Sequence, residues 1–135
     1  MKQLILCKGL PASGKSTFAK EWVNEDPTTR VRVNRDDIRR MLGPYWVPNR
    51  ENLVTRLENR AVTESLLNGY SVILDATNFK SEKWISKAAY YGVELIIKDF
   101  TDVPLNICIE RDKTRGVESV GEAVIRGMYD KYLKK

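Results

Sequence analysis

Histidine is absent from the 135 residues of this sequence. Catalytic systems that pair a serine or cysteine nucleophile with histidine are therefore excluded, and any general base must be a carboxylate, lysine, tyrosine or cysteine. Only two cysteines are present, Cys7 and Cys108, and both lie in apolar stretches without metal-ligand spacing. We expect both to be reduced core residues of a cytoplasmic protein.

Long apolar runs are missing as well. No stretch approaches the roughly 20 apolar residues that a transmembrane helix needs, and the N-terminal residues do not resemble a signal peptide. We therefore expect no membrane partner. The 23 lysines and arginines outnumber the 18 aspartates and glutamates, which gives a net charge of +5. This modest excess permits a polyanionic partner without requiring one.

Strand and helix patterns alternate along the chain. Apolar or alternating segments predict strands at residues 2–7, 30–34, 71–75 and 93–100. Amphipathic segments predict helices at residues 17–25, 35–42, 51–68, 82–91, 104–113 and 121–134. This alternation favours an α/β fold, with an open parallel sheet of about four strands flanked by helices, in one domain that covers residues 1–135. In the helix at 51–68, the predicted buried residues are Leu53, Val54, Leu57, Ala61, Val62 and Leu66.

The stretch from Gly9 to Ser16 matches the phosphate-binding pattern of glycine, four residues, glycine, lysine and serine or threonine. It lies between a predicted strand and a predicted helix, as this motif requires. Its glycines let the backbone approach a polyphosphate, whose charge the amide groups and the helix N-terminus attract. The alternative is an ordinary glycine turn. We expect the nucleotide-binding residues here to be Gly9, Ala12, Ser13, Gly14, Lys15, Ser16 and Thr17.

Three residues have expected roles around the phosphates of ATP. Lys15 would reach the outer phosphates, and the Ser16 hydroxyl would ligate Mg²⁺. Asp75 ends the apolar strand at 71–75, where a carboxylate can hold the same Mg²⁺. The alternative for Asp75 is a helix cap or a solvated loop position.

Asp36 and Asp37 follow the predicted strand at 30–34. A kinase that phosphorylates an alcohol needs a carboxylate that orients the hydroxyl and takes its proton, and either aspartate would serve. The alternative is that both only cap the short helix that follows. Arg39 lies three residues after Asp36 on the same helix face, where it would bind an acceptor phosphate or form only a surface ion pair.

Basic and aromatic residues gather in two further places. The densest basic cluster is made of Arg30, Arg32, Arg35, Arg39 and Arg40. Tyr45 and Trp46 follow it; they would be able to stack on a nucleobase, but we expect them to pack, as aromatic loop residues usually do. Arg111 and Arg115 are spaced to share a helix face and to close over the ATP phosphates as a lid. The alternative is an exposed helix end with cations near its C-terminus.

With these blocks the chain resembles the kinase domain of the phage-type polynucleotide 5′-hydroxyl kinases. The resemblance rests on residues 9–17, 34–39, 75–78 and 111–116, which occur in the family's order and rough spacing. It implies a P-loop kinase fold of the adenylate-kinase group, with a four-stranded parallel sheet, a helical lid and Mg·ATP as the phosphate donor. Many relatives carry a further 3′-phosphatase domain, for which we expect no room in this chain.

The same resemblance implies roles for single residues. Asp36 would be the general base, Arg39 would contact the 3′-phosphate of the acceptor, and Arg115 would grip an ATP phosphate. Thr77 and Asn78 would lie near the acceptor phosphate. The implied activity transfers the γ-phosphate of ATP to the 5′-hydroxyl end of DNA or RNA. A kinase for a small alcohol, such as a nucleoside, sugar or antibiotic, stays open as an alternative, as does a nucleotide-sensing module without catalysis.

Overall fold

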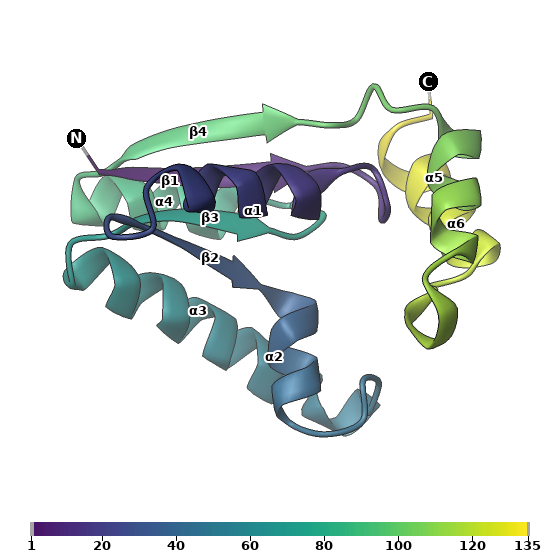
Figure 1. The fold of residues 1–135 in the computed structure, drawn as a ribbon, viewed down its shortest axis with the longest axis horizontal. Helices are drawn as coiled ribbons and strands as arrows, with labels where there is room; N and C mark the ends of the chain where they lie inside the picture. The colour runs from purple at the N-terminus through teal and green to yellow at the C-terminus, as the bar shows by residue number, and fades with distance from the viewer. Residues whose placement is uncertain (1, 135) are drawn as a thin grey trace.

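Four parallel strands form a single sheet in the structure, a computed structural model that describes residues 2–134. Their bounds are β1 (Gln3–Lys8), β2 (Arg30–Asn34), β3 (Ser71–Asp75) and β4 (Glu94–Asp99). The order across the sheet is β2-β3-β1-β4, and every neighbouring pair is parallel (Figure 1). The predicted α/β class and four-stranded parallel sheet are therefore confirmed.

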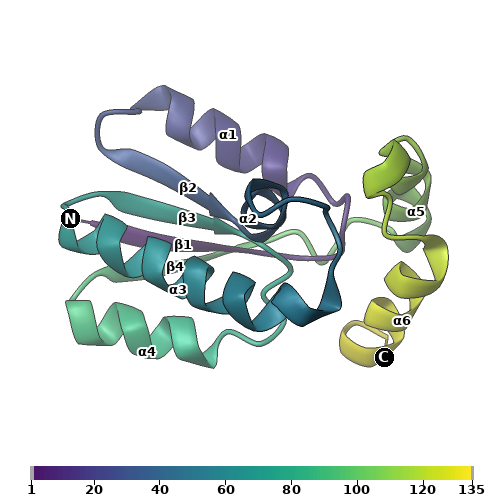
Figure 2. The same cartoon turned by 90° about the horizontal axis from the view of Figure 1, so that it is seen from below.

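In the described part of the chain, six helices surround this sheet, together with two short 3₁₀ turns, η1 (Pro48–Arg50) and η2 (Gly116–Glu118). Figure 2 shows α1 on one face of the sheet, α3 and α4 on the other, and α5 and α6 beyond the carboxyl ends of the strands. Within residues 2–134, none of the helices combines the length and the apolar character that a membrane crossing needs. The helix bounds are α1 (Lys15–Glu25), α2 (Arg35–Met41), α3 (Glu51–Leu67), α4 (Glu82–Tyr91), α5 (Leu105–Lys113) and α6 (Glu122–Tyr132).

Strand residues supply two apolar layers because successive side chains of a strand face opposite sides of the sheet. Leu4 and Leu6 of β1 pack with Val62 and other residues of α3 and α4. Ile5, between them in sequence, packs with Trp22 of α1 on the opposite face. This double burial explains why the central strands are almost wholly apolar, as parallel strands covered on both faces are.

A third apolar cluster belongs to the lid, which we define as α5, η2 and α6. Cys108 and Ile109 of α5 pack with Ile125 of α6, and Leu10 of the phosphate loop joins them. The phosphate loop is therefore in apolar contact with the lid. Cys7 and Cys108 are both buried and free, which confirms the prediction that they are reduced core residues.

The buried face of α3 differs in part from the prediction. Val54, Val62 and Leu66 are buried as expected, but Leu53 is 45 % exposed. The face turned inward contains every fourth residue from Val54 to Leu66, and this row includes Glu58, which is only 3 % exposed. Glu58 is accommodated because Arg35 Nη1 donates a hydrogen bond to its Oε1 at 3.1 Å.

Candidate active site

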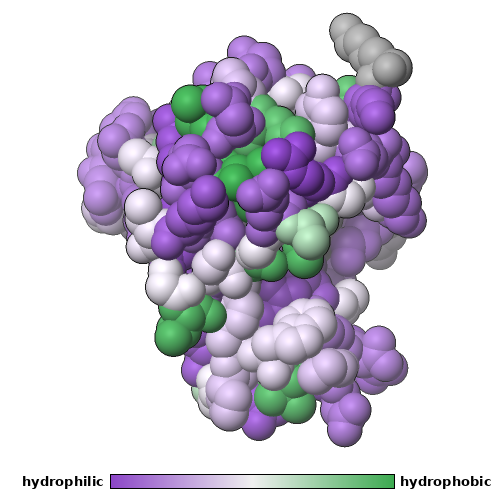
Figure 3. All heavy atoms as spheres, turned by 90° about the vertical axis from the view of Figure 1, so that its right-hand side faces the viewer, coloured by the Kyte–Doolittle hydropathy of each residue, from purple (hydrophilic) through white to green (hydrophobic). Residues whose placement is uncertain are grey.

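The carboxyl ends of β1, β2 and β3 bring the three predicted blocks together at one edge of the sheet. The backbone N–H of Gly9 donates to the Thr77 carbonyl at 3.1 Å, which joins the phosphate loop to the loop after β3. Asn34 donates from Nδ2 to the Asp75 carbonyl at 2.9 Å, which joins the ends of β2 and β3. Figure 3 views the molecule from this side, with α5 and α6 toward the viewer, and shows a largely hydrophilic surface with small hydrophobic patches. In open α/β sheets, ligands bind beyond this edge.

The phosphate loop has the compact backbone that its glycines allow. A Cβ at Gly9 would lie 2.9 Å from Ser13 Oγ and 3.0 Å from Phe100 Cβ, which is too close for any side chain. Gly14, directly before α1, has a φ of +106°, a region that favours glycine. These two constraints explain why the loop needs glycine at its start and at the helix entry.

Lys15 lies inside the loop that precedes it. Its Nζ donates to the carbonyl of Gly9 at 2.9 Å and to that of Leu10 at 2.5 Å. Burial lowers the pKa of Lys15 to about 8, although the negative charge of Asp75 acts in the opposite direction. An incoming phosphate would therefore replace carbonyl partners of Lys15 with a stronger, charged acceptor.

Ser16 and Asp75 form a pair of oxygen ligands suited to Mg²⁺. The Ser16 hydroxyl donates to Asp75 Oδ2 at 2.8 Å, and Asp75 is only 3 % exposed. A hydroxyl from the phosphate loop and a carboxylate from the neighbouring strand end are the oxygen donors that a hard cation prefers, so the residues fit the ion that this type of loop implies.

Arg32 completes this group and was missed as a site residue from the sequence. Its Nη2 and Nε donate to Asp75 Oδ2 at 2.8 and 3.0 Å, and its Nη1 donates to Asp37 Oδ2 at 2.7 Å. A usable signal was present: Arg32 lies two residues before Asn34 and so on the same face of β2, and Asn34 is aligned with Asp75 in the sheet.

Asn34, rather than either aspartate, caps α2. Its Oδ1 accepts a hydrogen bond from the Asp37 backbone N–H at 2.9 Å. The interpretation that Asp36 and Asp37 only cap this helix is therefore wrong for their side chains. Asp37 is 52 % exposed at its side chain and pairs with Arg32 and Arg40, whereas Asp36 turns toward the lid.

Asp36 is surrounded by three donors. Its Oδ1 accepts from Arg39 Nη1 at 2.6 Å and from the Tyr45 hydroxyl at 2.8 Å. Its Oδ2 lies 3.9 Å from Arg115 Nη2 of the lid. The structure thus brings together the predicted base, the predicted acceptor-side arginine and the predicted lid arginine.

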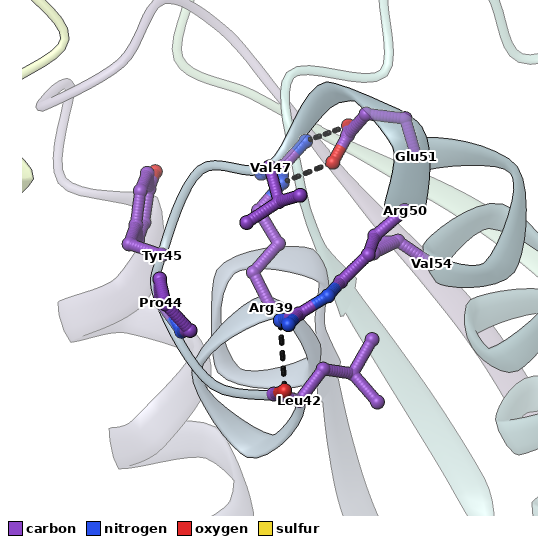
Figure 4. Close-up of a pocket in the computed structure, with 8 residues that line it drawn as sticks. All are labelled: Arg39, Leu42, Pro44, Tyr45, Val47, Arg50, Glu51 and Val54. Carbon is purple, nitrogen blue, oxygen red and sulfur yellow. Dashed lines mark hydrogen bonds and ion pairs between the residues drawn. The ribbon is translucent and has the colours of Figure 1, made fainter.

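Arg39 is held in place by a residue that the sequence did not single out, Glu51 at the start of α3. Arg39 Nε and Nη2 donate to the two carboxylate oxygens of Glu51 at 3.0 and 2.7 Å (Figure 4). These hydrogen bonds raise the pKa of Arg39 above its already high ordinary value, with burial acting in the opposite direction. Within residues 2–134, three of the five guanidinium N–H groups are used in the contacts with Glu51 and Asp36, so two stay available to an anionic ligand.

The two aromatic residues of the α2–α3 loop behave differently from each other. Tyr45 is partly buried as expected, and burial followed by its hydrogen bond to Asp36 raises its pKa to about 12. Trp46 is 58 % exposed, so the expectation that it packs is wrong. Its ring centre lies 5.5 Å from Arg39 Cζ, so the exposed Trp46 ring lies beside this guanidinium.

The lid arginines do not share one helix, because α5 ends at Lys113 and Arg115 begins the turn that follows. Arg111 Nη1 reaches the Ala12 carbonyl of the phosphate loop at 3.5 Å, while Arg115 points to Asp36. The lid also contacts α2 through Arg40, whose Nη2 donates to Glu118 Oε1 at 2.6 Å. These three contacts hold the lid over the edge of the sheet.

Thr77 and Asn78 both lie at this edge. The Asn78 amide donates to the Cys7 and Leu74 carbonyls at 2.7 and 3.2 Å, so it ties the ends of β1 and β3 together. Its φ of +51° is a conformation that asparagine tolerates better than most residues. Thr77, which is half-buried, is the member of this pair whose side chain stays available to a ligand.

A family model described as an AAA domain matches residues 4–134. The chain belongs to this family. Solved structures similar to this chain include P-loop kinases, and the fold expected from the resemblance is thereby confirmed.

Two curated relatives of this AAA-domain chain are themselves named as kinases. The L-seryl-tRNA(Sec) kinase of Methanococcus maripaludis is 31 % identical over 134 residues, which cover 96 % of this chain and 52 % of that protein. A protein of Autographa californica nuclear polyhedrosis virus, named as a candidate bifunctional polynucleotide kinase/RNA ligase, is 26 % identical over 98 % of this chain and 21 % of its own length. The chain thus spans about half or less of the curated relatives it matches.

Two solved structures illustrate the range of the fold. A chain of the Pnkp1/Rnl/Hen1 RNA repair complex is 29 % identical, with a TM-score of 0.78 over 97 % of this chain and 44 % of that one. The APS kinase CysC of Mycobacterium tuberculosis is 21 % identical, with a TM-score of 0.65 over 91 % of this chain and 75 % of that one. The second likeness shows the fold alone.

Asp112 fixes the lid turn of this AAA-domain chain. It is 1 % exposed, and it accepts hydrogen bonds from Ser119 Oγ at 2.5 Å and from the N–H groups of Val120 and Gly121 at 3.0 Å. Arg115 Nη1 lies 3.5 Å from its Oδ1. One buried carboxylate therefore orients the turn between α5 and α6 and the arginine that this turn carries.

Replacing Asp112 with alanine should lower the free energy of unfolding by about 3 kcal/mol, because it leaves buried donors without an acceptor. Burial acts to raise the pKa of Asp112, but its hydrogen bonds hold that pKa below the usual range. The stabilisation is therefore present above about pH 4 and is lost as the pH falls through the lowered folded-state pKa. Urea unfolding of the wild type and of Asp112→Ala, above and below about pH 4, measures the difference in the free energy of unfolding. A difference that stays constant into acid would contradict this role of the carboxylate.

Proposed function

We propose that this protein is a polynucleotide kinase that transfers the γ-phosphate of ATP to the 5′-hydroxyl of DNA or RNA. The observation that carries the proposal is the position of Asp36, 2.6 Å from Arg39 and 3.9 Å from Arg115, at the sheet edge that also carries the phosphate loop. A nucleotide sensor would need the phosphate loop but neither a candidate base nor an arginine directed at it.

The transfer follows from the roles that these side chains can take. The phosphate loop and Lys15 hold the β- and γ-phosphates of ATP, and the acceptor hydroxyl donates its hydrogen bond to Asp36. The hydroxyl oxygen forms a bond to the γ-phosphorus, its proton passes to Asp36, and the bond to the β,γ-bridging oxygen breaks to release ADP. Arg115 and Lys15 stabilise the negative charge on the phosphoryl group during its transfer. Mg²⁺ held by Ser16 and Asp75 would add positive charge at the phosphates.

Arg39 supports a phosphate-bearing acceptor rather than a neutral alcohol. Its guanidinium is fixed by Glu51, directed toward Asp36, and still has two N–H groups to donate. A nucleotide whose 5′-hydroxyl meets Asp36 would carry its 3′-phosphate toward this arginine. The viral relative and the RNA repair complex agree with such an acceptor.

A second candidate acceptor is the seryl hydroxyl of an aminoacylated tRNA, which the archaeal relative suggests by its name. The chemistry at Asp36 would be the same, since both acceptors are alcohols held close to nucleic acid phosphates. A small neutral alcohol is the third possibility, and Arg39 would then have no anion to bind.

Single-turnover transfer of labelled γ-phosphate to a panel of acceptors distinguishes these possibilities. The panel contains a nucleoside 3′-monophosphate, 5′-hydroxyl DNA and RNA oligonucleotides, seryl-tRNA and neutral sugars. We expect the label to appear on the 5′-hydroxyl oligonucleotides. In steady-state assays, the KM for the oligonucleotide should rise steeply with salt concentration. Label on seryl-tRNA or a sugar, with none on any 5′-hydroxyl end, would overturn the proposed acceptor.

Asp75→Asn should raise the Mg²⁺ concentration needed for half-maximal activity at least about tenfold, because it removes the charged ligand of the ion. Asp37→Asn is the matched control, since both carboxylates pair with Arg32. Calorimetric titration with ATP, with and without Mg²⁺, gives a readout that does not need turnover. An equal Mg²⁺ response in both variants would refute the assignment of Asp75.

A further inference from the structure

A groove of about 260 Å³ opens at the same edge of the sheet, and the chemistry above uses only part of it. It is bounded by the loop after β3, the first turn of α4, the middle of α3 and the end of α6. Thr77 and Asn78 line it, and so does Arg35, the neighbour of Asp36. In Figure 2, α3 and α4 lie on the face of the sheet opposite α1, the helix that the phosphate loop enters. The groove is therefore lined from the sheet face opposite α1 and lies next to the sequence neighbour of Asp36.

The charges that line this groove leave an excess of cations. Glu58 is nearly buried, and it pairs with Arg35 Nη1 at 3.1 Å, so these two charges largely cancel. Lys80 is exposed, and the Lys83 side chain is 50 % exposed, with its Nζ 3.9 Å from Glu58. The two lysines are thus the groups available to a polyanion.

Two aromatic residues, Phe79 and Tyr132, also line this groove. Phe79, from the loop after β3, stacks on Tyr132 of α6, with ring centres 4.6 Å apart and planes inclined by 11°. Tyr132 is still 37 % exposed, and Lys131 Nζ lies 5.2 Å from its ring centre. Aromatic rings beside cations are the surface on which single-stranded nucleic acids stack their bases and place their phosphates.

We propose that this groove binds the single-stranded segment that follows the reacting 5′ nucleotide, with phosphates at Lys80 and Lys83 and a base against Tyr132. The proposal rests on the proposed function and extends it: the enzyme prefers an acceptor of several nucleotides with an unpaired 5′ end. A duplex end would not place isolated bases against an aromatic side chain.

The test compares kcat/KM for a nucleoside 3′-monophosphate, a dinucleotide, a tetranucleotide and an octanucleotide, all with a 5′-hydroxyl. For the wild type, kcat/KM should rise about tenfold or more from the shortest acceptor to the longest. In a Lys80→Gln, Lys83→Gln double variant, the ratio of octanucleotide to monophosphate should fall at least about fivefold. The control is Lys20→Gln, Arg60→Gln, which removes two exposed charges outside the groove. Equal length dependence in both double variants would overturn the proposal.

Binding of a fluorescent octanucleotide, followed by anisotropy without ATP, tests the groove independently of catalysis. The slope of log affinity against log salt concentration should become shallower by about 0.7 for each lost phosphate contact. Loss of both lysines should therefore change it by about 1.4. If no acceptor is phosphorylated but this slope changes as expected, the proposed activity fails and the groove stands. If the slope is the same in the lysine variant and in the control, the groove proposal fails.

Two substitutions of Tyr132 test whether a base stacks on its ring. Tyr132→Ala should weaken octanucleotide binding about tenfold, whereas Tyr132→Phe should bind like the wild type, because stacking needs the ring and not the hydroxyl. Thermal unfolding of both variants checks that the lid is intact. Equal binding by alanine and phenylalanine would remove the base-stacking part of the proposal.

Discussion

Asp36→Asn should reduce kcat by a factor of about 10³, while the affinity for ATP stays close to that of the wild type. The amide has the size of the carboxylate, and its oxygen can still accept from Arg39 and Tyr45, so the local packing is preserved. It cannot take the proton of the acceptor hydroxyl. The loss should therefore fall on the chemical step and leave the phosphate loop, at the end of a different strand, unaffected.

Single-turnover rates at saturating ATP and acceptor measure this loss, and calorimetry measures ATP binding. Asp37→Asn is the control, because Asp37 belongs to the same sequence block but pairs with Arg32 and Arg40 at an exposed position. We expect that variant to stay within about threefold of the wild type. Retention of the full chemical rate by Asp36→Asn would show that another group takes the proton, or that the transition state needs no base.

The fold and the sequence blocks of the candidate site were accessible from the sequence because their signals are local. Leu4 to Cys7 form one continuous apolar run, and the glycines of the phosphate loop follow at once. The parallel direction of the strands then places Asp36 and Asp75 at the edge where the phosphate loop lies. Adjacency in the sheet follows from chain topology, so it needs no knowledge of side-chain contacts.

The partners of these residues were not accessible, because they come from distant segments. Glu51 meets Arg39 across the α2–α3 loop. Glu58 meets Arg35 from within the helix face that the sequence assigned to apolar residues. A buried carboxylate in a helix is read from the sequence as a solvated residue, since charged side chains are seldom buried without a partner. Only the approach of α2 to α3 shows where that partner is.

The arginine cluster at residues 30–40 shows the same limit. In the sequence it is the densest basic cluster, but each of its five arginines forms an ion pair with a carboxylate in the structure. Arg32, for example, serves Asp75 rather than a polyanion. The surface proposed to bind nucleic acid therefore depends on Arg39 and the groove lysines, and not on the arginine cluster as a whole.

Arg115→Ala is the second change with a large expected effect, a loss of about 10³ in kcat with a small change in the acceptor KM. Arg115 comes from the lid, lies 3.9 Å from Asp36, and would stabilise charge that appears on the phosphoryl group during transfer. Arg115→Lys should recover part of the loss, because it keeps the charge but not the planar fork. Arg126→Ala is the control, since Arg126 is an exposed lid arginine that pairs with Glu122 of the same helix.

Asp112 allows the role of Arg115 to be separated from the stability of the lid. If Asp112 acts on catalysis only by orienting Arg115, then Asp112→Asn should lower kcat in the wild type and have no further effect on kcat in the Arg115→Ala background. Its effect on the free energy of unfolding should persist in both backgrounds, because Ser119 and the N–H groups of the lid turn still need their acceptor. Equal losses of kcat in both backgrounds would mean that Asp112 supports the lid as a whole and that Arg115 does not depend on it for its catalytic position.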